Sequence, residues 1–88
     1  MKVALRAFAS CREALGTDLM EVEAPAGSTL RDLLRSLKSK GLDVLEGENL
    51  RAETNVLVNG EQVEYGKGLD TVLQEGDEVA VFPPVAGG

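Results

Sequence analysis

One apolar stripe at helical spacing, set among short alternating segments, is the feature that most limits how this chain can fold. The stripe consists of Leu30, Leu33, Leu34 and Leu37, and this spacing is typical of one face of an amphipathic helix. Thr29 is a good N-cap, Asp32 places an anion in the first turn, and Gly41 is suited to end the helix. Because one helix covers only one face of a small sheet, the pattern predicts a two-layer α+β domain whose other sheet face is open to water.

The strands are predicted from alternation of apolar and polar residues. The segments with this pattern are residues 3–8, 18–24, 54–58 and 77–82. Asn59-Gly60 favours a type I′ hairpin turn, which needs positive φ at both positions, and a brief strand through Val63 and Tyr65 is expected after it. The predicted order is therefore strand, strand, helix, strand, short strand, strand.

The connecting segments are predicted to hold little regular structure. Ser10 and Glu13 fit a capping box for a short helical turn that stops at Gly16. Residues 42–53 carry many charges without a period, so we expect a surface loop. Residues 66–76 are expected to form a loop with one helical turn around residues 69–73.

Length and charge exclude several classes of function. The chain has 88 residues and a formal net charge of −6, and a chain this small buries only about 60–65% of its unfolded surface, which suits one domain with a thin core. The acidic balance argues against nucleic acid and anionic membrane as partners, since both need a cationic face. No apolar stretch is long enough to span a bilayer. The lone cysteine, Cys11, forms no internal disulfide, which favours a reducing cytoplasm.

The residues of a self-contained catalytic centre are missing from the sequence. The chain has no His and one Cys, which leaves no nucleophile–base triad and too few ligands of the usual kind for zinc. The acidic pairs Glu46/Glu48 and Asp77/Glu78 are interpreted as solvated loop charges, and Cys11 as a small buried apolar residue. We therefore expect no bound cofactor and no catalysis by the chain itself, which leaves it the part of a carrier or a substrate.

Apolar side chains are expected to gather on the open face of the sheet. By the alternation, this face carries Ala4, Arg6, Phe8, Leu57, Ala80 and Phe82. Two of the chain's three aromatic residues fall in this set, which suggests the footprint of a partner, although single exposed apolar residues are common on protein surfaces. Arg12, close to Phe8, would add a directional ion pair, with a solvated arginine as the alternative.

The C-terminal segment FPPVAGG combines a stiff exit with a slender end. Pro83 and Pro84 stop the last strand and favour an extended path. The residues that follow them are Val85, Ala86, Gly87 and Gly88. Without Cβ atoms the two glycines pass through a narrow slot, and four residues reach ~13 Å at full extension. If Gly88 ends the mature chain, its carboxylate is a poor electrophile that needs activation, for example adenylation, before a nucleophile attacks; a frayed end without function is the alternative.

These segments resemble the MoaD/ThiS family of ubiquitin-like proteins, and within it most closely the molybdopterin synthase small subunits. The likeness spans nearly the whole chain and rests on residues 8–13 (FASCRE), Asn59-Gly60, residues 76–79 (GDEV) and above all residues 82–88 (FPPVAGG). It implies a β-grasp domain over residues 1–82, with a mixed five-stranded sheet in the order 2-1-5-3-4 and one main helix on one face. Residues 83–88 would be an extended Gly-Gly tail.

The resemblance also implies a mechanism. An E1-like adenylyltransferase uses ATP to adenylate Gly88, a sulfur donor system then gives a C-terminal thiocarboxylate, and the tail delivers its sulfur inside the large subunit of molybdopterin synthase to build a dithiolene. Phe8 and Phe82 match family positions that pack on these partners, beside Arg12 and Leu57 from the open-face pattern. Two alternatives stay open. One is a ubiquitin-like modifier joined to protein lysines through Gly88, because the long segment 42–53 resembles that of family members that also act as modifiers. The other is an inert β-grasp interaction module.

Overall fold

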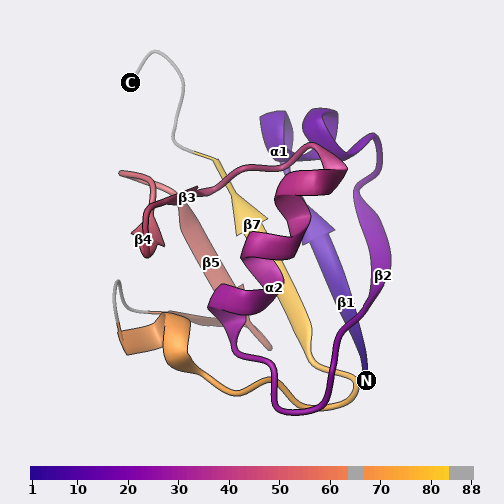
Figure 1. The fold of residues 1–88 in the computed structure, drawn as a ribbon. Helices are drawn as coiled ribbons and strands as arrows, with labels where there is room; N and C mark the ends of the chain where they lie inside the picture. Colours follow the sequence, from indigo (N-terminus) through magenta and orange to yellow (C-terminus); the bar gives the residue numbers. More distant parts are fainter. Residues whose placement is uncertain (64–66, 84–88) are drawn as a thin grey trace.

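The computed structural model describes residues 1–63 and 67–83, and its centre is a mixed five-stranded sheet with the main helix across one face (Figure 1). The strands of this sheet are β1 (Lys2–Ala7), β2 (Leu19–Glu23), β5 (Asn55–Val58), β6 (Glu61–Gln62) and β7 (Glu78–Phe82). A separate hairpin consists of β3 (Leu45–Glu46) and β4 (Asn49–Leu50). The helical segments are α1 (Ala9–Leu15), α2 (Leu30–Ser36) and the 3-10 helices η1 (Leu37–Lys40) and η2 (Lys67–Asp70).

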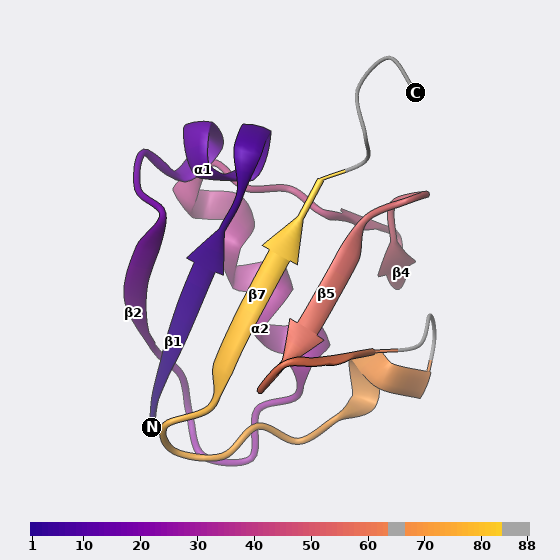
Figure 2. The same ribbon diagram turned by 180° about the vertical axis from the view of Figure 1, so that it is seen from behind.

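The strand order in the sheet is β2-β1-β7-β5-β6. Numbered along the chain within this sheet alone, that order is 2-1-5-3-4, so the expected β-grasp arrangement is confirmed, and the β3–β4 hairpin is an unpredicted addition. Strands β1 and β7 are parallel, whereas the other pairs are antiparallel. The first and last strands of the domain therefore lie side by side in the middle of the sheet. Figure 2 shows the face that these strands turn away from α2.

The core lies between the sheet and α2. The sheet contributes Val3, Leu5, Ala7, Val22, Val56, Val79 and Val81, all buried. The four leucines of the predicted stripe are each at most 1% exposed, and burying a leucine side chain contributes roughly 1.5–3 kcal/mol before its entropy cost. The inward sides of the predicted strands and helix are thus confirmed. In the part of the chain that the structure describes, no helix is long and apolar enough to cross a membrane.

Helix α2 begins at the predicted cap. The Thr29 hydroxyl accepts a hydrogen bond from the Asp32 N–H at 3.2 Å, and the Asp32 carboxylate accepts one from the Thr29 N–H at 3.0 Å. These bonds satisfy two amides that the helix leaves open. The bonds with Thr29 also hold the pKa of Asp32 below its ordinary value, with a smaller contribution from the nearby Arg35. After Ser36 the helix continues as the tighter 3-10 helix η1, which ends at Gly41 with φ 102°.

The start of α1 differs from the prediction. Phe8 is the N-cap residue and makes no side-chain cap bond, while Ala9 has the left-handed φ of 50°. Pairing between β1 and β7 reaches Phe8, whose N–H donates to the carbonyl of Val81 at 3.3 Å, so the chain must turn immediately afterwards. Ser10 therefore lies inside the helix, and the predicted capping box of Ser10 was wrong. Gly16 ends the helix with φ 80°, as predicted.

The expectation of a plain surface loop over residues 42–53 was also wrong. Leu42, Val44 and Leu50 are buried, and the segment forms the β3–β4 hairpin. The Glu48 carboxylate ties the hairpin to α2, since both of its oxygens accept hydrogen bonds from the Arg35 guanidinium at 3.2 Å. Leu42, Val44 and Leu50 share one strand parity, but the charged, glycine-containing residues 45–49 interrupt the alternation in the sequence.

The hairpin turn after β5 is confirmed. Asn59 and Gly60 have φ of 52° and 84°, as a type I′ turn requires. The Asn59 side chain donates to the Asp77 carboxylate at 3.0 Å and accepts from the Glu78 N–H at 2.9 Å, which anchors the turn to the start of β7. Strand β6 ends at Gln62, before the predicted end, and Tyr65 lies outside the described residues.

The predicted helical turn near residues 69–73 lies slightly earlier, at η2. Leu69 and Leu73 are both buried and close the end of the core beside α2. Leu73 donates its N–H to the carbonyl of Ser28 at 2.9 Å, which holds this segment against the start of α2.

Candidate functional site

Phe8 and Phe82 stack on the open face of the sheet, where β1 and β7 end. Their ring centroids lie 4.2 Å apart and their planes are 7° from parallel. The pair continues the parallel register in which Ala7 is opposite Val81. Phe8 is 38% exposed and Phe82 is half-buried, so the stack keeps apolar surface for contact with another molecule. The prediction that both rings lie together on this face is confirmed, whereas their role in partner binding stays a prediction.

An ion pair occupies the next row of the open face. Arg6 and Ala80 are opposite each other in β1 and β7, and the Arg6 Nε atom lies 3.1 Å from a carboxylate oxygen of Glu78. Both charged side chains are about half exposed, and a pair so open to water stabilises the fold by at most about 1 kcal/mol. The pair instead forms a polar row on the open face, in which the negative charge of Glu78 balances the positive charge of Arg6. Sequence reasoning placed Arg6 here but missed Glu78, although Glu78 has the same strand parity as Phe82.

On the other side of β7 the open face continues onto β5. Leu57 is opposite Ala80 and half-buried, as predicted for this face. Asn55 is opposite Phe82, and its side-chain oxygen accepts a hydrogen bond from the Gln62 amide at 2.6 Å. The stack therefore has an amide pair on one flank. Asn55 was missed although it shares the strand parity of Leu57.

Arg12 lies on α1, one turn after Phe8. Its backbone N–H donates to the carbonyl of Phe8 at 3.4 Å, and its side chain is exposed. Among the residues described, it forms no ion pair with a carboxylate. The guanidinium is thus available to a partner that approaches the stack, and the predicted directional ion pair stays a prediction.

Pro83 follows the stack directly and is the one residue of the predicted tail that lies within the described part of the chain. It lines a cavity of about 320 Å³ together with Cys11, Leu42 and Arg51. The other tail residues singled out by sequence lie outside the described residues, namely Pro84, Val85, Ala86, Gly87 and Gly88. The division into a domain of residues 1–82 and a tail of residues 83–88 therefore stays a prediction.

Cys11 is 4% exposed, and burial raises the pKa of its thiol. A raised pKa keeps the sulfur protonated at neutral pH, which disfavours nucleophilic chemistry. Its interpretation as a small buried apolar residue therefore fits the structure. No group of three or more His, Cys, Asp or Glu side chains suited to a metal ion occurs within residues 1–63 and 67–83.

Of the two acidic pairs interpreted as solvated loop charges, Glu46 and Glu48 are exposed, whereas Asp77 and Glu78 are half-buried and Glu78 belongs to β7. The Glu46 carboxylate lies 3.6 Å from the Arg51 guanidinium, and the Asp77 carboxylate accepts from the Gln74 N–H at 2.8 Å. These carboxylates stabilise turns rather than gather at one point. The described residues thus form a surface suited to contact with another protein at the end of β7, rather than a catalytic centre.

Comparison with known families agrees with this description. The sequence profile of the ThiS family matches residues 5–88, which is nearly the whole chain. The chain belongs to the ThiS family. Proteins of this type are small non-catalytic carriers with a ubiquitin-like fold, and this ThiS-family chain is therefore a carrier protein and not an enzyme.

Individual relatives of this ThiS-family chain cover most or all of its length. It is 40% identical to small archaeal modifier protein 3 of Haloferax volcanii over 100% of both chains. It is 39% identical to the molybdopterin synthase sulfur carrier subunit of Escherichia coli, covering 92% of this chain and 93% of that protein. These names place the chain among ubiquitin-like sulfur carriers and modifiers.

Solved structures of similar proteins share the fold. The crystal structure of SAMP1 from Haloferax volcanii superposes with a TM-score of 0.83 at 30% identity, over 100% of both chains. A complex of subunits 1 and 2 of the molybdopterin-converting factor from Helicobacter pylori contains a chain with a TM-score of 0.64 at 25% identity, over 100% of both chains. Relatives of this ThiS-family chain thus form complexes with partner proteins.

Proposed function

We propose that this chain is a sulfur carrier for molybdopterin biosynthesis. An E1-like adenylyltransferase uses ATP to convert the Gly88 carboxylate into an acyl adenylate, with release of pyrophosphate. Sulfide supplied by a donor system then attacks the acyl carbon, the bond to AMP breaks and AMP leaves, and a C-terminal thiocarboxylate remains. The family match that runs through the Gly-Gly segment to residue 88 is the observation that carries the proposal.

The described residues suit a chain that presents its tail to another protein. Strand β7 pairs with β1 up to Val81 and with β5 up to Phe82, and the stack on Phe8 fixes the last ring before Pro83. A rigid base reduces the entropy that is lost when the tail enters a partner's pocket. The chain supplies no activating group of its own in this scheme, because ATP is bound and used by the partner enzyme.

The open face is proposed as the contact surface for the partner. Its candidate contacts are Phe8, Arg12, Leu57 and Phe82. Aromatic and arginine side chains are enriched among residues that dominate binding energy, and Arg12 adds a charge at the edge of the stack. Similarity to the Escherichia coli carrier subunit and to the Helicobacter pylori complex supports the large subunit of molybdopterin synthase as the second partner.

A second candidate function is protein modification. Similarity over the full length to small archaeal modifier protein 3 favours conjugation of Gly88 to protein lysines. Both functions share adenylation of Gly88 and differ in the nucleophile that follows, which is sulfur in one case and a lysine amine in the other. An inert β-grasp interaction module is the remaining alternative.

Intact-protein mass spectrometry of the chain from its native cells tests the proposal. A carrier shows a fraction of chains in which one oxygen is replaced by sulfur, and this fraction disappears when Gly88 is deleted. A modifier shows slower-migrating adducts that vanish with the same deletion. If cofactor synthesis survives deletion of Gly88 and no adducts exist, both functions are wrong. A Val72→Ala variant, which alters an exposed residue far along the chain from the tail, is the control for expression.

A further inference from the structure

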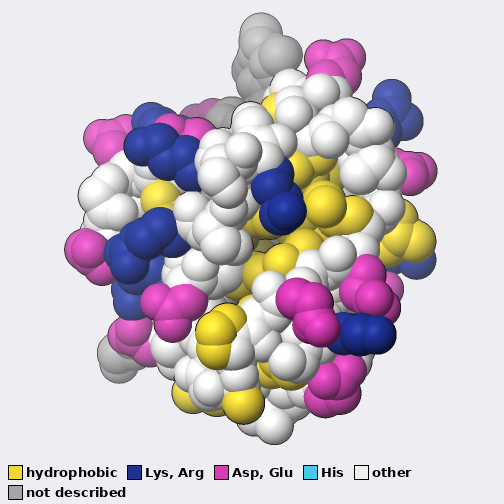
Figure 3. All heavy atoms as spheres, turned by 45° about the vertical axis from the view of Figure 1, so that its right-hand side comes forward, with side chains coloured by type: hydrophobic (Ala, Val, Ile, Leu, Met, Phe, Trp, Pro, Cys, Tyr) yellow, Lys and Arg dark blue, Asp and Glu magenta, His cyan; other side chains and the backbone are white. Residues whose placement is uncertain are grey.

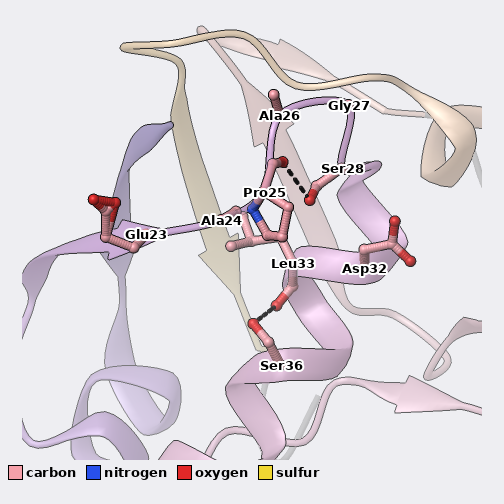
Figure 4. A pocket seen from close by; sticks show the side chains of 9 residues that line it. All are labelled: Glu23, Ala24, Pro25, Ala26, Gly27, Ser28, Asp32, Leu33 and Ser36. Atoms are coloured by element: carbon pink, nitrogen blue, oxygen red, sulfur yellow. Dashed lines mark hydrogen bonds between the residues drawn. The ribbon is translucent and has the colours of Figure 1, made fainter.

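A groove lies between the end of β2 and α2, away from the face that carries the stack. It has a volume of about 400 Å³, and its walls include Ala24, Pro25, Leu33 and Ser36. Figure 4 shows Pro25 and Leu33 facing each other across it, with the Ser36 hydroxyl already bonded to the Leu33 carbonyl. On this side of the molecule, Figure 3 shows hydrophobic side chains gathered in a hollow, with a basic side chain at its upper edge and acidic side chains below it. The groove is thus lined by apolar residues together with Ser28, Asp32 and Ser36.

The strand beside this groove has an unpaired edge. Strand β2 ends the sheet and pairs only with β1. Ala24 and Met1 exchange two hydrogen bonds, of 2.9 Å and 2.7 Å, which sets the alternation of backbone groups along the pair. By this alternation the N–H and C=O groups of Leu19, Glu21 and Glu23 point away from β1. Such an edge pairs readily with an added strand.

The side chains of β2 divide into two sets. Met20, Val22 and Ala24 lie on the side of the sheet that α2 covers, and Ala24 also lines the groove, whereas Glu21 and Glu23 are exposed on the other side. A strand added to this edge would follow the same alternation. Successive side chains of the added strand would point alternately toward the side of the groove and toward the carboxylates of Glu21 and Glu23.

We infer that the β2 edge docks an extended segment of a partner protein in which apolar residues alternate with lysine or arginine. The main chain of the segment pairs with the outward groups of β2. Its apolar side chains enter the groove against Ala24 and Pro25, and its basic side chains lie opposite Glu21 and Glu23.

Charge selects this occupant over a second copy of the chain. Two β2 edges placed side by side would bring Glu21 and Glu23 of both copies together, and like charges on paired strands destabilise the pairing. Lys2 compensates Glu21 only weakly, at 3.9 Å between exposed groups, and Glu23 has no ion pair among the residues that the structure describes. Both carboxylates are thus available to a basic partner.

The position of the edge allows docking while the tail is in use. Glu23 is opposite Lys2, at the beginning of β1, whereas Phe82 lies beside Phe8, just past the end of β1. The groove and the tail therefore lie at opposite ends of the sheet. Docking on β2 is independent of sulfur transfer and would let a third protein recognise the carrier in its complexes.

Titration of the full-length, ¹⁵N-labelled chain with the peptide Val-Lys-Val-Arg-Val-Lys-Val tests the inference. The amide signals of Leu19, Glu21 and Glu23 should shift, together with those of Leu33 and Ser36. The double variant Glu21→Gln/Glu23→Gln should bind about threefold to tenfold more weakly at low salt, as expected for two exposed ion pairs. Glu61→Gln, on the opposite edge strand β6, is the matched control and should bind as the parent does.

Other results would overturn the inference. One is a set of shifts confined to Phe8 and Phe82 or to β6, and another is equal affinity of the double variant and the parent. Binding of the peptide Val-Glu-Val-Glu-Val-Glu-Val with the same affinity would exclude charge recognition. Self-association through β2 in sedimentation experiments would instead make a second copy the occupant. The side chains of Glu21, Glu23 and Glu61 are exposed, so their replacement leaves the core unchanged and each variant is expected to fold.

Discussion

Phe82, the last residue of β7, lies face to face with Phe8, the residue that joins β1 to α1, with 4.2 Å between the ring centroids. The two residues come from opposite ends of the chain and meet because β1 and β7 are parallel neighbours. The stack fixes the point at which the tail leaves the domain. It also presents apolar surface on the open face where β1 and β7 end.

Replacement of Phe82 by alanine should separate these two roles. Loss of the stack should lower the free energy of unfolding by about 0.5–1.5 kcal/mol, measured by urea denaturation. Binding to the adenylyltransferase or to the synthase large subunit should weaken by ~1–3 kcal/mol, measured by calorimetry with the folded variant.

Val72→Ala is the control for that experiment, because Val72 is 50% exposed and pairs with Thr29 at the start of α2 rather than with the strands that carry the stack. It should leave partner binding unchanged. A Phe82→Ala chain that fails to fold would mean that Phe82 acts mainly as a core residue, and unchanged partner binding would remove the open face from the proposed interface.

The capping box of α2 should make stability depend on pH. The folded-state pKa of Asp32 is lowered by its bonds with Thr29, so its stabilising effect is present above the ordinary aspartate pKa and is lost as pH falls through the lowered value. Asp32→Asn should therefore differ from the parent at neutral pH and converge with it in acid, measured by urea unfolding across the acid range. A constant difference at every pH would contradict this linkage.

Thr29→Ala removes the other half of the same cap. It should cost about 1 kcal/mol at neutral pH. It should also raise the pKa of Asp32 toward its ordinary value, which NMR titration of the side-chain carboxyl measures. If that pKa does not move, the hydrogen bonds with Thr29 are not its cause.

Leu50→Ala tests whether residues 42–53 belong to the core. Leu50 is 7% exposed and packs in the main cluster, so the substitution should cost about 2–4 kcal/mol in unfolding free energy. Asn49→Ala changes the exposed neighbour in β4 and should stay within about 0.5 kcal/mol of the parent. Equal small effects at both positions would restore the view of this segment as a surface loop.

Gly41→Ala and Gly47→Ala form a matched pair for steric contact. Both glycines have positive φ, but an added Cβ at Gly41 would lie 2.7 Å from the Ala14 carbonyl oxygen, whereas Gly47 has open space around it. Gly47→Ala should cost about 1–2 kcal/mol through backbone strain. Gly41→Ala should cost on the order of 3 kcal/mol, since overpacking adds to the strain. Thermal unfolding of the two variants measures the difference, and equal losses would mean that the α1–Gly41 contact relaxes freely.

Local signals decided most of the secondary structure. The leucine stripe with Thr29 and Asp32 placed α2 correctly, because helix periodicity and capping act within a few residues. Asn59-Gly60 likewise placed the turn after β5. The local pattern gave a wrong prediction at Ser10, because a contact with a distant strand sets the start of α1. The backbone hydrogen bond from Phe8 to Val81 in β7 brings the helix start forward, and Ser10 lies inside the helix.

The sequence by itself determined the helix, the strands and their buried sides, because each depends on neighbouring residues. The sequence also contains the Gly-Gly segment, and its resemblance to a known family predicted the strand order. Only the tertiary structure decided which distant residues meet: the stack of Phe8 on Phe82, the pairing of Arg6 with Glu78, and the burial of Leu50. These contacts depend on strand register and on the path of a hairpin in space, which no local period encodes.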